Sequence, residues 1–81
     1  MGVYSDATID LSKAIELKPS ADAYYWRGYA NYLEKFDNQA LADFNRAIQM
    51  RPEHPDSYYM RGLVYYGIQK DAESLADFDK A

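Results

Sequence analysis

The sequence predicts an all-α fold, an α-solenoid of antiparallel helix pairs with five helices and about two and a half copies of one repeating unit. Three observations predict it. Whole segments recur at a spacing of 33 or 34 residues, apolar residues within them recur at spacings of three and four, and prolines or capping residues separate them. No segment alternates apolar and polar residues for long enough to form a strand.

The repeat can be read directly from the residues. Residues 24–28 (YYWRG) recur 34 positions later as residues 58–62 (YYMRG), and residues 40–44 (ALADF) recur as residues 74–78 (SLADF). An earlier copy of the second block begins at Ala7, at an offset of 33. A unit of this length corresponds to a pair of helices that stacks on its neighbours.

The first helix is expected near residues 5–17, with Ser5 as its N-cap and Pro19 as its stop signal. Its apolar face is formed by Ala7, Leu11, Ala14 and Ile15. The second helix is expected near residues 21–34, with Ser20 as its N-cap.

The third helix is expected near residues 37–50, capped by Asp37 and followed by Pro52. The fourth is expected near residues 55–68, because Pro55 suits the first turn of a helix.

The fifth helix is expected near residues 71–81, with Asp71 as its N-cap. All five helices are predicted to form one domain over residues 1–81. Its parts are a partial repeat with only the second helix (5–20), a full repeat (21–54) and a repeat truncated at its C-terminal end (55–81). We therefore expect either an excerpt of a longer array or chains that stack end to end.

The helices are of two kinds. The first, third and fifth each have one apolar stripe and one charged face, which is typical of an outer layer. The helices at 21–34 and 55–68 carry bulky apolar groups nearly all round, so they must be covered on several sides or present aromatic rings to a ligand. Gly28 and Gly62 recur in the middle of these helices, which suggests that another helix approaches closely there.

These features resemble the tetratricopeptide repeat (TPR) family, whose unit is a 34-residue helix-turn-helix. The matching positions of the first unit are Tyr24, Gly28, Ala40, Phe44, Ala47 and Pro52, and those of the second are Tyr58, Gly62, Tyr65, Ser74, Phe78 and Ala81. The resemblance implies that the helices at 21–34 and 55–68 line a concave groove that takes peptides or helices. Some members grip a C-terminal carboxylate with a basic clamp, but Tyr and Leu occupy those sites here.

The chain departs from the family pattern at three positions. Arg27 and Arg61 stand where the family usually has Leu, and Asn31 stands where it usually has Tyr. The acidic residues Asp10, Asp43 and Asp77 also recur with the repeat. Our hypothesis is that each Arg pairs with an Asp of a neighbouring helix.

The candidate binding site is a tyrosine stripe repeated on the two aromatic helices. Spacings of three and four place its members on one face of each helix. The candidate partner-binding residues are Asp22, Tyr25, Tyr29, Tyr32, Asp56, Tyr59, Leu63 and Tyr66. The main hypothesis is a protein-interaction scaffold that binds an apolar, partly basic peptide or helix.

Two alternatives remain open for the stripe. The rings could merely pack one helix against the next, because aromatic stripes are often core. The chain could also be a self-assembly module that oligomerises through its uncapped terminal helices, where Ile9 and Phe78 would be the sensitive residues.

Composition argues against other classes of protein. The net charge of −4 argues against a basic face that binds nucleic acid. The absence of cysteine excludes disulfides and thiolate metal sites, and it suits a cytoplasmic location. No apolar run is long enough to span a membrane. The sole histidine, His54, has no partner at a catalytic or metal-binding spacing, so we expect it to be a loop or N-cap residue. For the chain we expect no catalytic site, no metal site and no cofactor.

Overall fold

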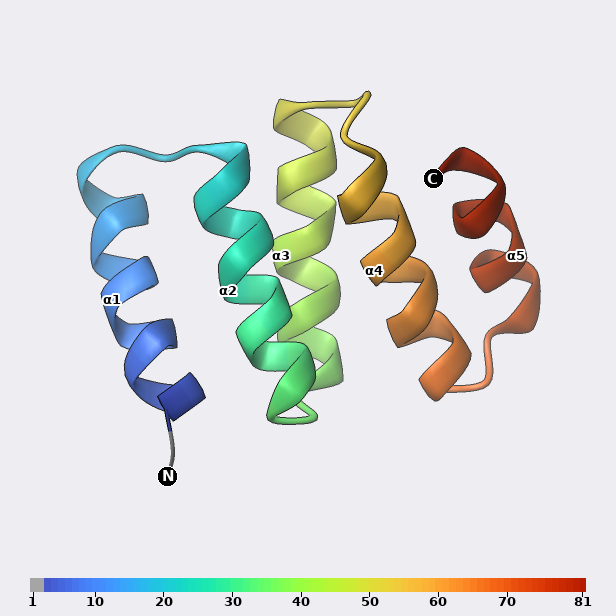
Figure 1. The fold of residues 1–81 in the computed structure, drawn as a ribbon, viewed down its shortest axis with the longest axis horizontal. Coiled ribbons are helices and arrows are strands. Elements are labelled where there is room, and N and C mark those ends of the chain that lie inside the picture. The colour runs from blue at the N-terminus through green and yellow to red at the C-terminus, as the bar shows by residue number, and fades with distance from the viewer. Residues whose placement is uncertain (1–2) are drawn as a thin grey trace.

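The computed structural model of the chain describes residues 3–81, with side chains from residue 8 onward. Within this range the chain forms five α-helices and no strand, as predicted. They are α1 (Val3–Leu17), α2 (Ala21–Leu33), α3 (Asp37–Met50), α4 (Pro55–Gly67) and α5 (Asp71–Lys80). Each helix lies beside the next one in the chain, from α1 at one end to α5 at the other (Figure 1).

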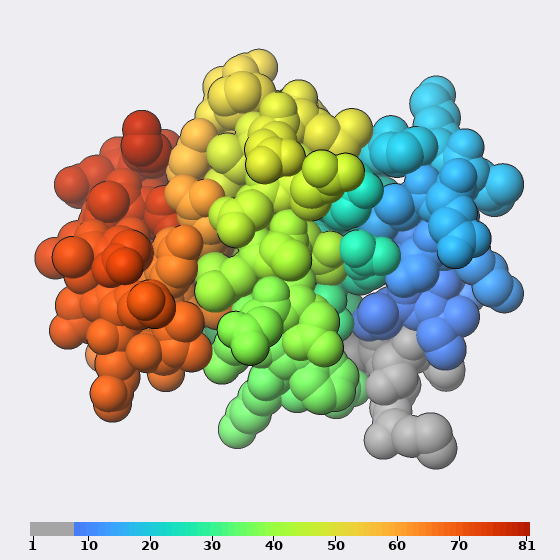
Figure 2. Space-filling view, turned by 180° about the vertical axis from the view of Figure 1, so that it is seen from behind, coloured from blue at the N-terminus to red at the C-terminus, as the bar shows by residue number. Residues whose placement is uncertain are grey.

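The helices form two layers. The backbones of α2 and α4 approach each other, whereas among the described residues those of α1 and α3, and those of α3 and α5, lie farther apart. Seen from behind, α3 lies in front with α1 and α5 on either side of it (Figure 2). Because helices on the inside of a bend lie closer together than those on the outside, α2 and α4 form the inner layer of a curved stack.

The core lies between the layers. One cluster joins α3 to α4 through Ala40, Phe44, Met60 and Val64, of which Phe44 has no exposed surface. A second cluster joins three helices through Ile15, Tyr24 and Ala47. Burial of these apolar side chains is the main favourable contribution to the free energy of folding for a chain of this size.

The two recurring glycines sit where helices meet, as the sequence predicted. The ring of Phe44 lies over Gly28, and the ring of Phe78 lies over Gly62 in the next repeat. The absence of a Cβ atom lets the ring approach the helix backbone closely. This explains why glycine recurs in mid-helix despite its low helix propensity.

The predicted N-caps are only partly correct. Ser20 caps α2, and its hydroxyl accepts a hydrogen bond of 3.1 Å from the backbone N–H of Ala23. The prediction for Ser5 was wrong, because α1 begins at Val3 and Ser5 lies within the helix. Pro55 occupies the first turn of α4 as expected, and His54 is the N-cap residue.

The predictions that Asp37 and Asp71 cap helices were also wrong. Each Asp is the first residue of its helix, and the cap positions belong to Phe36 and Lys70, which make no side-chain cap hydrogen bond. The reason is the shortness of the loops. The backbone N–H of Phe36 bonds the carbonyl of Asn31 at the end of α2, and its own carbonyl accepts the first bond of α3. A carboxylate in the first turn still interacts favourably with the helix dipole.

Candidate functional site

The predicted stripe runs along the inner layer, on α2 and α4, but its members differ in exposure. Asp22, Asp56 and three of the tyrosines are exposed, while Tyr25, Tyr32 and Leu63 are half-buried and pack against the core. The exposed fractions of the three tyrosines are 36% for Tyr29, 49% for Tyr59 and 68% for Tyr66. The packing interpretation therefore holds for Tyr25, Tyr32 and Leu63, and the three other tyrosines of the stripe remain exposed.

Tyr25 is the centre of an aromatic cluster that joins α2 to its neighbours. Its ring centroid lies 5.0 Å from that of Trp26, 5.3 Å from that of His54 and 5.9 Å from that of Phe44. The contacts with Trp26 and His54 are edge-to-face, an arrangement that aromatic pairs prefer. Tyr25 is thus packed among rings of its own helix, of α3 and of the connection before α4.

The electrostatic environment of Tyr25 links the two repeats. Burial raises the pKa of Tyr25, and the negative charge of Asp56 on α4 raises it further, with a smaller contribution from Tyr29. Asp56 therefore lies within range of a ring on α2. The stripes of the two repeats thus lie near enough at this point for a charge on α4 to act on a ring of α2.

The two acidic residues of the stripe are not equivalent. A carboxylate oxygen of Asp22 lies 3.5 Å from Nη1 of Arg51 and 4.0 Å from Nε2 of His54. Asp56 forms no ion pair with any of the described residues. Asp56 is thus the carboxylate that is free to attract a basic group, while the charge of Asp22 is partly balanced within the chain.

Trp26 was not among the predicted site residues, although it lies beside them. It is 51% exposed and contacts Tyr29, with ring centroids 5.9 Å apart and planes nearly perpendicular. Its counterpart in the next repeat, Met60, is buried in the core. An exposed tryptophan among tyrosines is typical of binding hot spots, and its spacing of four from Asp22 could have indicated a place on this face.

Two members of the stripe line hollows at its lower end. Tyr32 lines one of about 380 Å³ together with Leu33, Lys35, Asp37 and Gly67. Tyr66 lines another of about 300 Å³ together with Asp71, Ser74, Leu75 and Phe78. A third hollow of about 610 Å³, lined by Tyr66, Gly67, Gln69 and Asp71, shares residues with both, so the depressions adjoin one another at this end of the stripe.

The predicted Arg–Asp pairs are confirmed on α2–α3 and α4–α5. Nε and Nη2 of Arg27 donate to the two carboxylate oxygens of Asp43 at 2.9 and 2.7 Å, and Arg61 donates to Asp77 at 2.8 and 2.7 Å. Both carboxylates are buried, and the hydrogen bond to the carboxylate raises the pKa of each Arg. Asp10, the third aspartate of the series, is exposed. The pairs hold the helices of each repeat together.

A serine–histidine pair lies at the start of α4. Nδ1 of His54 lies 2.7 Å from Oγ of Ser57, and Nε2 faces Asp22. The grouping contains the residue types of a hydrolytic triad, but Ser57 has no exposed surface. A nucleophile must reach its substrate, so this pair serves to fix the connection between α3 and α4.

The fold defines a helical repeat protein built from stacked helix pairs. The sequence model of the TPR repeat family matches residues 37–69. Among solved structures, the crystal structure of MamA is similar over 98% of this chain, with a TM-score of 0.93 and 32% sequence identity. The chain spans 47% of that structure's length. No curated protein sequence gives a significant match.

A repeat of the tetratricopeptide family is thus matched over residues 37–69, and the helical-repeat fold is shared with MamA over nearly the whole chain. This fold indicates a protein-interaction scaffold, because TPR domains in general bind protein partners and are in general non-catalytic. Across the part of the chain that the structure describes, no helix has both the length and the apolar character needed to cross a membrane.

Proposed function

We propose that the chain binds a peptide or helix of a partner protein on the tyrosine-lined inner face of α2 and α4. The contact residues are Asp22, Tyr25, Tyr29, Tyr32, Asp56, Tyr59, Leu63 and Tyr66, with Trp26 added at the edge. The observation that carries the proposal is the exposure of Tyr29, Tyr59 and Tyr66 on the inner layer of the stack.

These three rings contribute less to the core than their neighbours do. Tyr25 and Tyr32 pack against the cluster around Phe44, whereas the three exposed rings are outside that cluster. Apolar aromatic area left in water raises the free energy of the free protein, and a partner that covers it recovers this free energy. Tyr and Trp also lose little side-chain entropy on binding, which suits them to be anchors.

The charge of the face favours a partner with a basic residue. Asp56 is exposed and unpaired among the described residues, beside the ring of Tyr25. A lysine or arginine flanking an apolar anchor of the partner would meet this carboxylate and could lie over an aromatic ring. The proposed ligand is therefore an apolar segment with at least one positive charge.

The proposed role requires no chemistry. The described side chains include no cluster of three or more His, Cys, Asp or Glu that could hold a metal ion, and Ser57 is buried. We infer that binding itself is the activity of this domain.

A peptide-display selection tests the proposal. A random peptide library is selected against the intact chain, and the dissociation constant of a selected peptide is measured by calorimetry. Tyr59→Ala and Tyr29→Ala should each weaken binding by about tenfold or more, the size expected of a hot spot. Met50→Ala, an exposed apolar change at the end of α3 and outside the stripe, is the matched control.

The outcomes of the selection differ clearly. Selected peptides enriched in apolar and basic residues support the proposal. Peptides whose affinity is unchanged by both tyrosine variants would show that the binding face is elsewhere.

Self-assembly is the second candidate, because large apolar side chains are exposed on the terminal helices. The exposed fractions are 55% for Ile9 and 88% for Leu17 on α1, and 65% for Leu75 on α5. Phe78 is a poor probe of this hypothesis since its ring packs on Gly62. Size-exclusion chromatography with light scattering over a dilution series tests it, with Ile9→Ser and Leu75→Ser expected to shift an oligomer to monomer. A monomer at every concentration contradicts it.

A further inference from the structure

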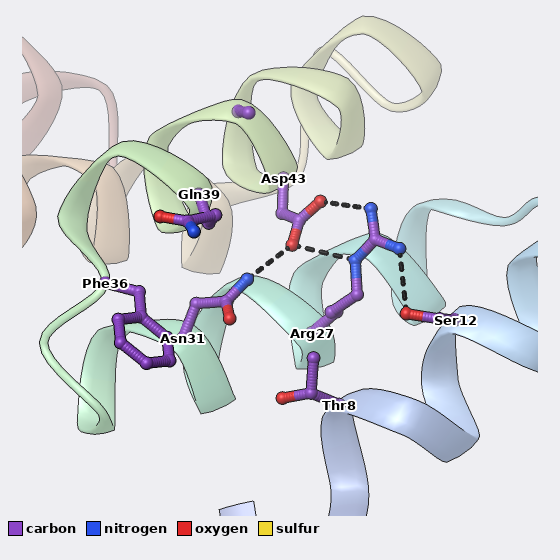
Figure 3. A pocket seen from close by; sticks show the side chains of 8 residues that line it. Thr8, Ser12, Arg27, Asn31, Phe36, Gln39 and Asp43 are labelled. Carbon is purple, nitrogen blue, oxygen red and sulfur yellow. Dashed lines mark hydrogen bonds and ion pairs between the residues drawn. The ribbon is translucent and has the colours of Figure 1, made fainter. Parts of the chain in front are cut away.

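A hollow of about 390 Å³ lies on the opposite side of α2 from the tyrosine stripe. It opens between α1 and α3, where atoms of α2 are visible at depth (Figure 2). Its lining residues are Thr8, Ser12, Arg27, Asn31, Phe36, Gln39, Ala42 and Asp43, drawn in Figure 3. Arg27 lies two residues from Tyr25, about 200° around the helix, so the hollow is independent of the proposed groove. Its size lies at the lower end of the range of about 300–1,000 Å³ for ligand clefts.

The second repeat shows what surrounds an arginine at this position. Cζ of Arg61 lies 5.5 Å from the ring centroid of Tyr58 and 5.8 Å from that of Tyr65, three residues before it and four after it. In the first repeat, Cζ of Arg27 lies 5.6 Å from the ring centroid of Tyr24, the counterpart of Tyr58. The counterpart of Tyr65 is Asn31. Arg27 thus has the first ring of the pair and lacks the second.

The charge of the hollow is already balanced. Arg27 donates from Nε and Nη2 to Asp43 and from Nη1 to Oγ of Ser12, at 3.1 Å. Asn31 donates a further hydrogen bond of 2.9 Å to the same carboxylate. An anionic ligand would therefore meet a neutral ion pair. The guanidinium is planar, and with three of its five N–H donors in these bonds its exposed face remains able to stack on an aromatic ring.

The rest of the lining suits an aromatic ring with a polar group. The ring of Phe36 is 50% exposed at the edge of the hollow and offers an aromatic contact. The side-chain amides of Asn31 and Gln39 lie on the same side (Figure 3) and are able to bond a hydroxyl as donor or acceptor. Both kinds of group therefore border the space beside Arg27.

We propose that this hollow is a second protein-binding site, which takes a tyrosine side chain of a partner protein against Arg27 and Phe36. The incoming phenol ring supplies the aromatic neighbour that Tyr65 provides to Arg61 within the second repeat. Its hydroxyl bonds the amide of Asn31 or Gln39.

The test uses p-cresol, the side-chain analogue of tyrosine, on the intact chain. Nitrogen-15 NMR follows the Nε–Hε signal of Arg27 and the side-chain amides of Asn31 and Gln39 during a titration up to the solubility limit of p-cresol. We expect saturable shifts at these signals with a dissociation constant in the millimolar range. Toluene, which lacks the hydroxyl, should bind several-fold more weakly.

Two reciprocal variants sharpen the test. Asn31→Tyr restores the pattern of the second repeat, so the chain's own ring should occupy the space and abolish the shifts at Arg27. Tyr65→Asn should open the equivalent space and create new shifts at Nε–Hε of Arg61. Since Lys70 stands where the first repeat has Phe36, adding Lys70→Phe should strengthen this new binding. Phe36→Ala, a change at a half-exposed ring, should weaken binding at Arg27 without affecting the fold.

The proposal is overturned if wild-type chain shows no saturable shift at Arg27, or if Asn31→Tyr leaves the shifts unchanged. Shifts confined to Tyr25, Tyr29 and Tyr59 would place p-cresol in the groove and also contradict it. Because the groove and the hollow lie on opposite sides of α2, either proposal can fail without the other.

Discussion

The ring of Phe44 lies against the backbone of Gly28 so closely that a Cβ atom at residue 28 would be 2.8 Å from Cε1 of that ring. Phe44 has no exposed surface and is held on its other side by the core. The same relationship joins Phe78 to Gly62. Each glycine therefore sets how closely the two helices of its repeat approach each other.

The first prediction concerns this contact. Gly28→Ala should lower the free energy of unfolding by about 1–2 kcal/mol, because overpacking a buried ring outweighs the gain in helix propensity. Gly67, in the last turn of α4, has open space around its missing Cβ and is the matched control. Gly67→Ala should raise stability by up to about 1 kcal/mol. Urea denaturation measures both, and equal effects would refute the packing argument.

The second prediction concerns the buried ion pair. Arg27→Leu alone should destabilise the chain by about 3 kcal/mol, because the carboxylate of Asp43 is left buried with only Asn31 as a partner. The double variant Arg27→Leu/Asp43→Leu should be much less destabilised. A double-mutant cycle by chemical denaturation measures the coupling between the two side chains. If the two single changes simply add, the pair contributes nothing specific to stability.

The third prediction concerns alkaline pH. The pKa of Tyr25 is raised above its usual value of 10.0 by burial, and then by Asp56 and Tyr29, so the folded chain holds the phenol proton more tightly than the unfolded chain. This contribution to stability is fully present below about pH 10 and is lost as the pH rises through the folded pKa. Wild-type chain should therefore lose more stability above about pH 10 than Tyr25→Phe.

Urea denaturation at a series of alkaline pH values measures this difference, with Tyr66→Phe as the control at an exposed ring. Parallel stability curves for the wild type and Tyr25→Phe would show that Tyr25 is not responsible for the pH dependence.

The fourth prediction separates the true N-cap from the false ones. Ser20→Ala should lower stability by about 1 kcal/mol, because the N–H of Ala23 loses its acceptor. Asp37→Ala should cost less, about 0.5 kcal/mol, since Asp37 only places a negative charge in the first turn of α3. Thermal and urea unfolding of both variants measure which one loses more stability. A larger loss for Asp37→Ala than for Ser20→Ala would contradict the assignment of Ser20 as the true N-cap.

Much of the fold could be predicted because its determinants are local or repeated. Apolar periodicity and the stops at Pro19 and Pro52 predicted five helices within one or two residues of their observed ends. The Arg–Asp pairs were predictable because Arg27 and Asp43 recur together, at the same offset, as Arg61 and Asp77. The caps were less predictable, since Ser5, Asp37 and Asp71 are residue types that suit several positions at a helix start.

The helices, the repeat and the pairing of buried charges could be read from the residues, because they depend on spacing along the chain. Which aromatic rings are exposed depends instead on how the helices pack. Tyr25 and Tyr59 hold the same place in their repeats, yet Tyr25 is half-buried because Trp26 and His54 also pack against it, while Tyr59 is exposed. Likewise the hollow beside Arg27 depends on how far α1 and α3 lie apart over α2. Exposure and hollows depend on side chains contributed by several helices at once, and no spacing within one helix specifies them.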